Sequence, residues 1–424
     1  MLKAIVPRLE AVTVTSKGRW TLVFLFLSMF IFCGCWDRTE IDERAFVVGV
    51  AVDLAEATET NGSKPPSPQH FPFIEKEAGD TSLTYTHKQI SYLMTVELAV
   101  LHALSAGPSD GNKEGTGDPS WVIGATAPTI QAASTAINLR VYRPLFFGHQ
   151  QVLIIGEEAA RENLRPILDF FTRHTRTKRK MRIAIAQGKA SDILSIKPRL
   201  EALASVYLFR LFQSAPQHSL GLDADLNQAI VSLHSSGHAV ISRVRRSLDG
   251  QEAYNGGAAV IKDWSLVGWL EDIETQGYLL AKGVSSSGRV SIPVATRPSA
   301  LIEYVYHHCR TKTNARIEDG KLSFEIELCL EGFITEETAA ADLTTEFIGW
   351  VEEALSEEIT RRVHMALHKL QKTYGVDALE LGRHLEISDP KLWERIKGDW
   401  PQLYPTVPIR IDTTARIRRT GSTK

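Results

Sequence analysis

The chain of 424 residues has few cysteines, no excess of one charge and only one long uncharged apolar stretch. Four cysteines without a CxxC pair exclude a disulfide-rich scaffold and the common cysteine zinc sites. With 48 basic and 50 acidic residues the net charge is -2, so the composition does not indicate a nucleic-acid partner. Hydrophobic residues at 43% and charged residues at 23% are typical of a globular protein.

The apolar stretch runs from Trp20 to Trp36 and follows a basic segment. A basic lead, a short apolar core and a small residue before a cysteine are typical of a lipoprotein signal. Cys33 follows the bulky Phe32, so we predict a signal peptide over 1–34 and lipidation at Cys35. An uncleaved anchor is the alternative, because 17 uncharged residues approach the length of a membrane span. In both cases the basic lead places the rest outside the cytoplasm.

About 390 residues follow Cys35, enough for two or three domains. We predict an N-terminal α/β domain over 35–198, a small middle α+β domain over 199–287 and a C-terminal α+β domain over 288–424. The first contains an apolar strand, Ala45–Asp53, and polar surface inserts at 56–82 and 107–120. In the last, apolar residues recur almost every four positions over 343–374, which predicts one long helix that ends at Gly375. The fold class is therefore α+β, with mixed or antiparallel sheets flanked by helices.

Cys309 and Cys329 lie on two alternating runs that flank an Asp-Gly turn signal. A three-residue loop over 318–320 places the two cysteines opposite each other, where an oxidising compartment would allow a disulfide. A two-residue loop puts them out of register. The other interpretation is two small buried thiols.

One segment is strongly basic, with six positive charges in ten residues. A solvated loop is the simplest interpretation. Because each basic residue near an anionic lipid surface contributes on the order of 1 kcal/mol, a membrane-facing surface is a second interpretation, and an acidic protein partner is a third. The six residues are Arg173, Arg176, Lys178, Arg179, Lys180 and Arg182.

Residues that would indicate catalysis or metal binding do not form a known motif. His364 and His368 are four apart, but the glutamate of a zinc-protease motif is missing beside the first. His307 and His308 are neighbours on a strand and therefore point to opposite faces. We predict no enzyme, no cofactor and no metal site.

Several stretches, taken in order, resemble one family, the Ger(x)C lipoproteins, which are the C subunits of spore germinant receptors. The start Cys35-Trp36-Asp37-Arg38 matches the mature start of these proteins. The other matching stretches are Phe147–His149, Val152–Glu157, Ile167–Phe170, Gly256–Val260, Leu266–Leu270, Glu274-Thr275, Gly277-Tyr278, Tyr374–Asp377, Lys391–Trp393 and Arg416–Gly421. Trp36, Phe147, Gly148 and Trp393 match family positions that we interpret as structural.

The resemblance implies a three-domain α+β lipoprotein that carries a diacylglycerol group on Cys35 at the outer face of the spore's inner membrane. It also implies two integral-membrane partners, the A and B subunits, and a non-enzymatic role in receptor assembly or signalling during germination. The alternative is a solute-binding lipoprotein of a transport system, which predicts a deep pocket between domains. An anchored hydrolase is disfavoured because no catalytic set is present.

Overall fold

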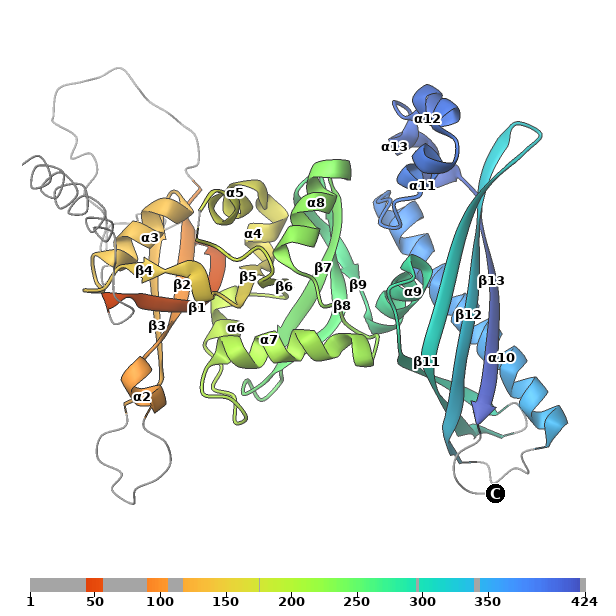
Figure 1. Cartoon of the computed structure of the whole chain (residues 1–424), viewed down its shortest axis with the longest axis horizontal. Coiled ribbons are helices and arrows are strands. Elements are labelled where there is room, and N and C mark those ends of the chain that lie inside the picture. The colour runs from red at the N-terminus through yellow and green to blue at the C-terminus, as the bar shows by residue number, and fades with distance from the viewer. Residues whose placement is uncertain are drawn as a thin grey trace, which may run out of the picture. The chain divides into compact units, whose positions relative to one another are not determined.

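The computed structural model describes residues 43–55, 90–105, 117–174, 176–294, 297–338 and 344–419. The predicted signal peptide, Cys35 and most of the two predicted inserts lie outside the described residues. Residues from Ala45 onward form one compact unit, which holds every strand named below (Figure 1).

The larger of two sheets contains nine strands in the described part of the chain. Eight follow the order β3-β2-β1-β5-β6-β7-β8-β9, and the short β4 pairs with the start of β1. The strands are β1 (Ala45–Leu54), β2 (Tyr92–Ala99), β3 (Ser120–Ala127), β4 (Leu145–Phe146), β5 (Val152–Gly156), β6 (Arg182–Ala186), β7 (His238–Arg246), β8 (Ala253–Lys262) and β9 (Ser265–Leu270).

The centre of this sheet is parallel, because β1, β5, β6 and β7 run in the same direction. The antiparallel strands β2 and β3 extend it beyond β1, and β8 and β9 extend it beyond β7. The predicted strand at Ala45–Asp53 is confirmed and is buried along this whole length, as expected for a strand with covered faces.

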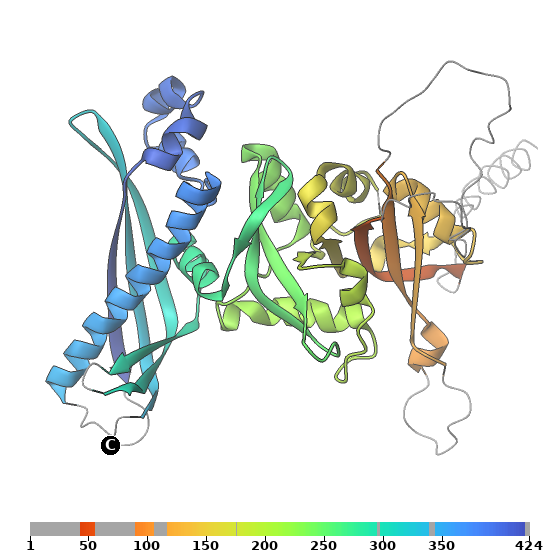
Figure 2. The same ribbon diagram turned by 180° about the vertical axis from the view of Figure 1, so that it is seen from behind.

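Helices cover both faces of the larger sheet (Figures 1 and 2). Helices α3, α4, α5 and α8 pack on the face that carries Leu153 and Ile155. Helices α6 and α7 pack on the opposite face, against Val152 and Ile154. The bounds are α3 (Ile130–Asn138), α4 (Glu157–Glu162), α5 (Arg165–Arg173), α6 (Ala190–Leu194), α7 (Ala204–Ser214) and α8 (Leu226–Ser236).

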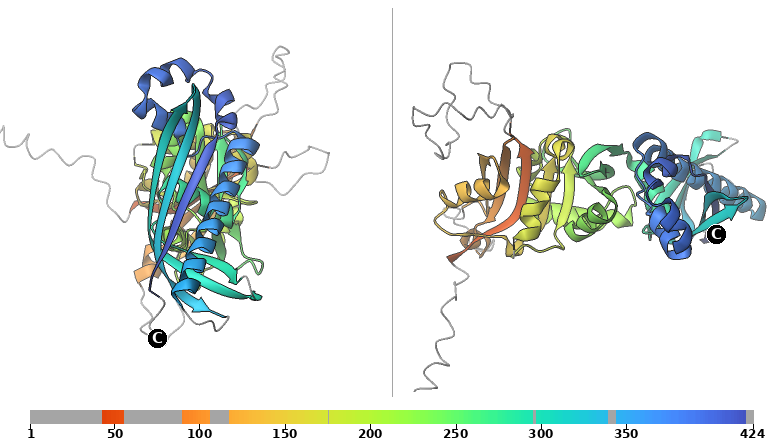
Figure 3. Two further views of the ribbon diagram at one scale, coloured as in Figure 1. Left: turned by 90° about the vertical axis from the view of Figure 1, so that its right-hand side faces the viewer. Right: turned by 90° about the horizontal axis from the view of Figure 1, so that it is seen from above.

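The smaller sheet has the strand order β10-β11-β12-β13, with β13 parallel to β12 and the other pairs antiparallel. Helix α10 lies along one face of it (Figure 3). Side chains of β12 alternate, so that Phe324, Ile326 and Leu328 are buried while their neighbours are partly exposed. The strands are β10 (Gly288–Val294), β11 (Arg297–Glu318), β12 (Lys321–Glu337) and β13 (Ile409–Arg419).

The predicted long helix at 343–374 is confirmed. It consists of α10 (Thr345–Leu367) and a π-helical continuation, η4 (His368–Tyr374), and it ends at Gly375 with a φ of 61°. The α+β class is confirmed as well. The remaining elements are α2 (Leu101–Ser105), η2 (Phe147–His149), η3 (Ala215–Gln217), α9 (Asp272–Lys282), α11 (Leu381–Ser388), α12 (Pro390–Ile396), α13 (Trp400–Leu403) and η5 (Tyr404–Thr406).

The boundary predicted near residue 198 does not separate two sheets. Strand β6 lies before it and β7 after it, yet the two pair in parallel within the larger sheet. Helical and strand periodicity does not carry information about which strands pair. The boundary predicted at 287/288 coincides with the start of the smaller sheet at Gly288. The division into three domains stays a prediction.

A buried carboxylate on β2, Glu97, fixes helix α7 to the sheet. It accepts hydrogen bonds from the backbone N–H groups of Ala204 (2.9 Å) and Ser205 (2.8 Å) and from the Ser120 hydroxyl (2.7 Å). The Ser205 hydroxyl donates to it as well. A carboxylate with no exposed surface needs such donors, because it has lost its hydration.

We expect the Glu97→Ala variant to lose about 3 kcal/mol of unfolding free energy, because the backbone amides of Ala204 and Ser205 would be buried without an acceptor. The midpoint of urea unfolding measures the change. Glu353→Ala, at an exposed position in α10, is the control and should shift stability by less than about 0.5 kcal/mol. Equal midpoints for the two variants would contradict the role given to Glu97.

Candidate functional site

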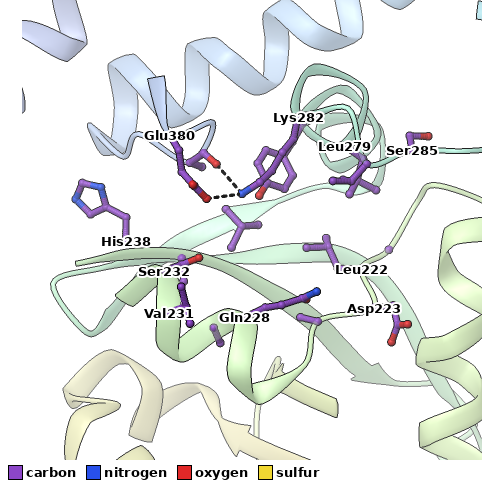
Figure 4. A pocket seen from close by; sticks show the side chains of 18 of the residues that line it. Leu222, Asp223, Gln228, Val231, Ser232, His238, Leu279, Lys282, Ser285 and Glu380 are labelled. Atoms are coloured by element: carbon purple, nitrogen blue, oxygen red, sulfur yellow. Dashed lines mark hydrogen bonds and ion pairs between the residues drawn. The ribbon is translucent and has the colours of Figure 1, made fainter. Parts of the chain in front are cut away.

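A pocket of about 500 Å³ lies between β7, α8, α9 and the segment that follows η4 (Figure 4). Apolar residues from each of these elements line part of it. The polar side chains at its wall include Gln228, Ser232, His238, Lys282 and Glu380.

Lys282, near the end of α9, is held by two acceptors across the pocket. Its Nζ donates to the backbone oxygen of Ala378 (3.1 Å) and to Glu380 Oε1 (3.2 Å), as Figure 4 shows. Burial alone would lower the pKa of Lys282, but Tyr278 and Glu380 outweigh it and raise that pKa. Lys282 therefore stays charged and fastens α9 to the segment after η4, and it is not poised as a nucleophile.

Asp377 and His238 lie in the same pocket. The Asp377 carboxylate accepts from the backbone N–H groups of Leu381 and Gly382, both at 2.9 Å, and from Trp400 Nε1 at 3.1 Å. Burial raises the pKa of Asp377, although these donors oppose the shift. Burial also lowers the pKa of His238, with Asp263 and Asp377 acting in the opposite direction. Asp377 thus serves as the acceptor for the start of α11, which explains its burial.

The hydroxyl groups of the pocket do not form a catalytic set in the described residues. Ser285 Oγ pairs with Ser219 Oγ (2.7 Å) and with the Tyr306 hydroxyl (2.8 Å), and none of these contacts reaches an imidazole. The Nδ1 atom of His238 is buried without a hydrogen-bond partner. The geometry allows a small molecule to bind but does not supply a nucleophile with its base.

Two glycines of the stretches that carry the family resemblance, Gly268 and Gly277, stand where two elements meet closely. A Cβ at Gly277 of α9 would collide with the backbone oxygen of Arg362 in α10. A Cβ at Gly268 of β9 would collide with the Tyr374 hydroxyl, which contacts both the N–H and the oxygen of Trp269 at 3.2 Å. These stretches therefore meet where β9 and α9 contact the long helix formed by α10 and η4.

Arg243 completes this junction from β7. Its guanidinium is 1% exposed and donates to both Glu271 oxygens (3.0 and 2.9 Å) and to the Gly256 oxygen (2.7 Å). The bidentate contact lowers the pKa of Glu271. Gly257, with a φ of 75°, leaves the space that the guanidinium fills. Sequence reasoning missed Arg243 and Glu97, although a charged residue inside a mostly apolar strand is a signal for both.

We expect Gly277→Ala to lower the thermal unfolding midpoint by several degrees, because the added methyl group forces α9 away from α10. Gly349→Ala is the matched control, since a Cβ there meets nothing within 4 Å and replaces glycine inside an exposed helix. It should stabilise the protein by about 0.5–1 kcal/mol. Destabilisation by both variants would contradict a specific close contact at Gly277.

The six basic residues singled out in the sequence separate into two groups. Arg182 is largely buried and pairs with Asp223, and Arg173 pairs with Asp169 (2.7 Å). The other four, Arg176, Lys178, Arg179 and Lys180, are exposed. Arg176 lies over the Phe146 ring at 5.8 Å. The surface predicted from six residues is thus smaller, and its interpretation stays a proposal.

Cys309 and Cys329 are both free, and they are not opposite each other. The predicted three-residue loop is wrong, because Glu318 pairs with Lys321 across a two-residue Asp-Gly turn. In that register Cys329 lies opposite Arg310. A bulge at His307 also changes which residues of β11 face α10, so that Cys309 packs against the core while Cys329 lies on the other face.

Burial raises the pKa of Cys309 to about 11 from its ordinary value of 9.0. At pH 8 this lowers its thiolate fraction about a hundredfold, and the thiolate is the form that reacts with iodoacetamide. We expect peptide mass spectrometry of the folded chain to show Cys329 alkylated much faster than Cys309, with equal rates after unfolding in urea. A peptide linked through both cysteines, or equal rates in the folded chain, would contradict this arrangement.

Cys35 lies outside the described residues, so lipidation there stays a prediction. In the part of the chain that the structure describes, no helix is long and apolar enough to cross a membrane.

The sequence matches two family profiles that together cover most of its length. Residues 75–246 match the spore germination protein N-terminal domain, and residues 256–421 match the spore germination B3/GerAC-like C-terminal domain. Among curated proteins, the chain is similar to spore germination protein YndF of Bacillus subtilis (strain 168), with 24% identity over 95% of this chain and 97% of that protein. It is also similar to spore germination protein B3 of the same organism, with 23% identity over 94% and 97%.

A solved structure agrees with the fold. The crystal structure of the GerBC protein matches with a TM-score of 0.55 and 21% identity, and covers 78% of this chain and 95% of that chain. Fold and sequence together define a spore germination protein of the class that joins these two domains. The chain belongs to the GerAC-like, or Ger(x)C, family, as the resemblance in its sequence indicates.

Proposed function

We propose that the chain is the C subunit of a spore nutrient germinant receptor, tethered by lipid on Cys35 to the outer face of the spore's inner membrane. It acts beside the integral-membrane A and B subunits and is needed for receptor assembly or signalling. Its role is non-enzymatic.

The similarity to spore germination proteins over nearly the full length of the chain carries this proposal. The structure adds two supporting features. Gly268, Gly277 and Tyr374, which belong to the stretches of the family resemblance, are engaged in close packing between elements. The Ser219 and Ser285 hydroxyl groups of the pocket bond to each other, and no hydrogen bond from either to an imidazole is found in the described residues.

Deletion of the gene in a spore former that lacks paralogous receptors should slow or abolish germination in nutrients, measured as loss of optical density. A Cys35→Ala allele should behave like the deletion, because the chain loses its lipid. Cys33→Ala is the matched control and should germinate normally. A non-nutrient trigger should still work in every strain, which shows that the spores are intact.

Normal nutrient germination of the deletion strain would overturn the receptor role. Mass spectrometry of the mature N-terminus tests lipidation separately, so a receptor subunit that is held by an uncleaved anchor would be recognised as such.

The alternative, a solute-binding lipoprotein, draws on the pocket whose wall includes His238. Calorimetric titration of the full chain with single nutrients decides between the two. Tight binding that His238→Phe abolishes, with germination unaffected by the deletion, would favour the alternative.

A further inference from the structure

The chain segments that lead into β1, β5 and β6 meet at one edge of the larger sheet. The three strands are parallel neighbours, so their amino ends lie together. The segment from the predicted lipid site enters at Ala45, the loop after α3 leads through β4 toward β5, and the basic loop leads into β6. We call this the amino edge, and it comprises Leu139–Phe146 and Arg176–Lys180.

Direct contacts connect these segments. The backbone N–H of Ala45 donates to the Pro144 oxygen at 3.0 Å, and β4 lies beside the start of β1 in Figure 1. The rings of Phe46 and Phe146 are 5.8 Å apart, and Arg176 lies over Phe146 at the same distance. Phe146 therefore contacts both Arg176 of the basic loop and Phe46, which follows the residue where the chain enters β1.

The basic loop is fixed by its own backbone. The N–H of Thr177 donates to the His174 oxygen and that of Met181 to the Lys178 oxygen, both at 3.2 Å. The Arg179 oxygen accepts from the N–H of Asn227 at 3.0 Å. The loop thus holds Lys178, Arg179 and Lys180 exposed, while the exposed Arg176 lies over the Phe146 ring.

Nearby acidic groups do not cancel this charge. Asp169 and Asp223 are occupied by Arg173 and Arg182, and Asp225 accepts from the Gln228 backbone at the start of α8. The amino edge is therefore net positive.

Apolar groups at the same edge are unusually exposed. Tyr142 is 88% exposed and Leu139 is 75% exposed, and Arg143 lies over the Tyr142 ring at 5.1 Å. Tyrosine flanked by basic residues is the composition that membrane-water interfaces favour. An acidic protein surface would account for the cations but not for a leucine and a tyrosine left in water beside them.

We propose that the amino edge lies against the anionic lipid surface, with Tyr142 and Leu139 at the interface and Arg176, Lys178, Arg179 and Lys180 over the headgroups. Ala45 lies ten positions after Cys35, and a segment of that length spans at most about 35 Å, so the tether keeps this edge within reach of the bilayer. The inference rests on the proposed lipid tether and adds an orientation to it.

The test uses the full chain reconstituted into vesicles of phosphatidylcholine alone or of phosphatidylcholine with one third phosphatidylglycerol. Hydrogen exchange followed by mass spectrometry should show slower exchange in peptides covering Leu139–His149 and Arg176–Arg182 on the anionic vesicles. The difference should disappear at high salt, because the attraction is screened.

Arg179→Glu with Lys180→Glu should remove the protection, since each basic residue contributes about a fivefold gain in surface affinity and reversal also adds repulsion. Lys391→Glu with Arg395→Glu, two exposed residues of α12, makes the same charge change elsewhere and should leave the protection intact. Tyr142→Ser should weaken the protection without abolishing it.

Equal exchange on the two vesicle types, or equal effects of the two double variants, would overturn the proposal and leave an acidic protein as the partner of this edge. The phosphatidylcholine vesicles test the lipid tether separately from the orientation of the amino edge. A chain that does not stay bound to these vesicles has no lipid tether, which counts against the proposed function and not against the orientation.

Discussion

Glu97 sits inside β2 with no contact to water, and its carboxylate is the point at which α7 is attached to the larger sheet. Asp53 does the same on β1, where it accepts from the backbone N–H groups of Ala190 (2.6 Å) and Ser191 (2.9 Å) in α6. The helices of one face are thus fixed by carboxylates that rise from the strands beneath them. If these acceptors were absent, the backbone groups at the start of each helix would be buried unpaired, and that face would lose its cover.

Periodicity was sufficient to predict most elements, since the strand at Ala45–Asp53 and the helix over 343–374 both have strong patterns. Strand pairing could not be predicted, because β7 pairs with β6 although more than fifty residues separate them, and the local sequence pattern does not indicate which strand is the neighbour. The cysteine register failed because the hairpin loop has two residues and not the three that were predicted, and an Asp-Gly pair occurs in loops of either length. The facing of Cys309 was missed for a separate reason. One extra residue at His307 reverses the alternation of β11, and alternating apolar residues on either side of a bulge look like one continuous strand.

The candidate site shows the same limit. The basic segment was visible as a run of charges, but the run could not reveal that Arg182 forms an ion pair with Asp223 while Lys180 is exposed. Glycines such as Gly277 stood out only through resemblance, and their reason is a close approach between helices that are far apart in the chain. The role of a residue that acts through a contact far away in the sequence can be assigned only when the contacting residue is known.

The two halves that the family profiles recognise end at residue 246 and begin at residue 256, on either side of the turn that joins β7 to β8. These two strands are paired along almost their entire length, so the halves share one continuous backbone ladder. Arg243 of the first half also fills space left by Gly257 of the second. A chimera that took each half from a different relative would have to match β7 of one protein to β8 of the other. A substitution in one of these strands is therefore tolerated only when the other strand carries a compensating substitution.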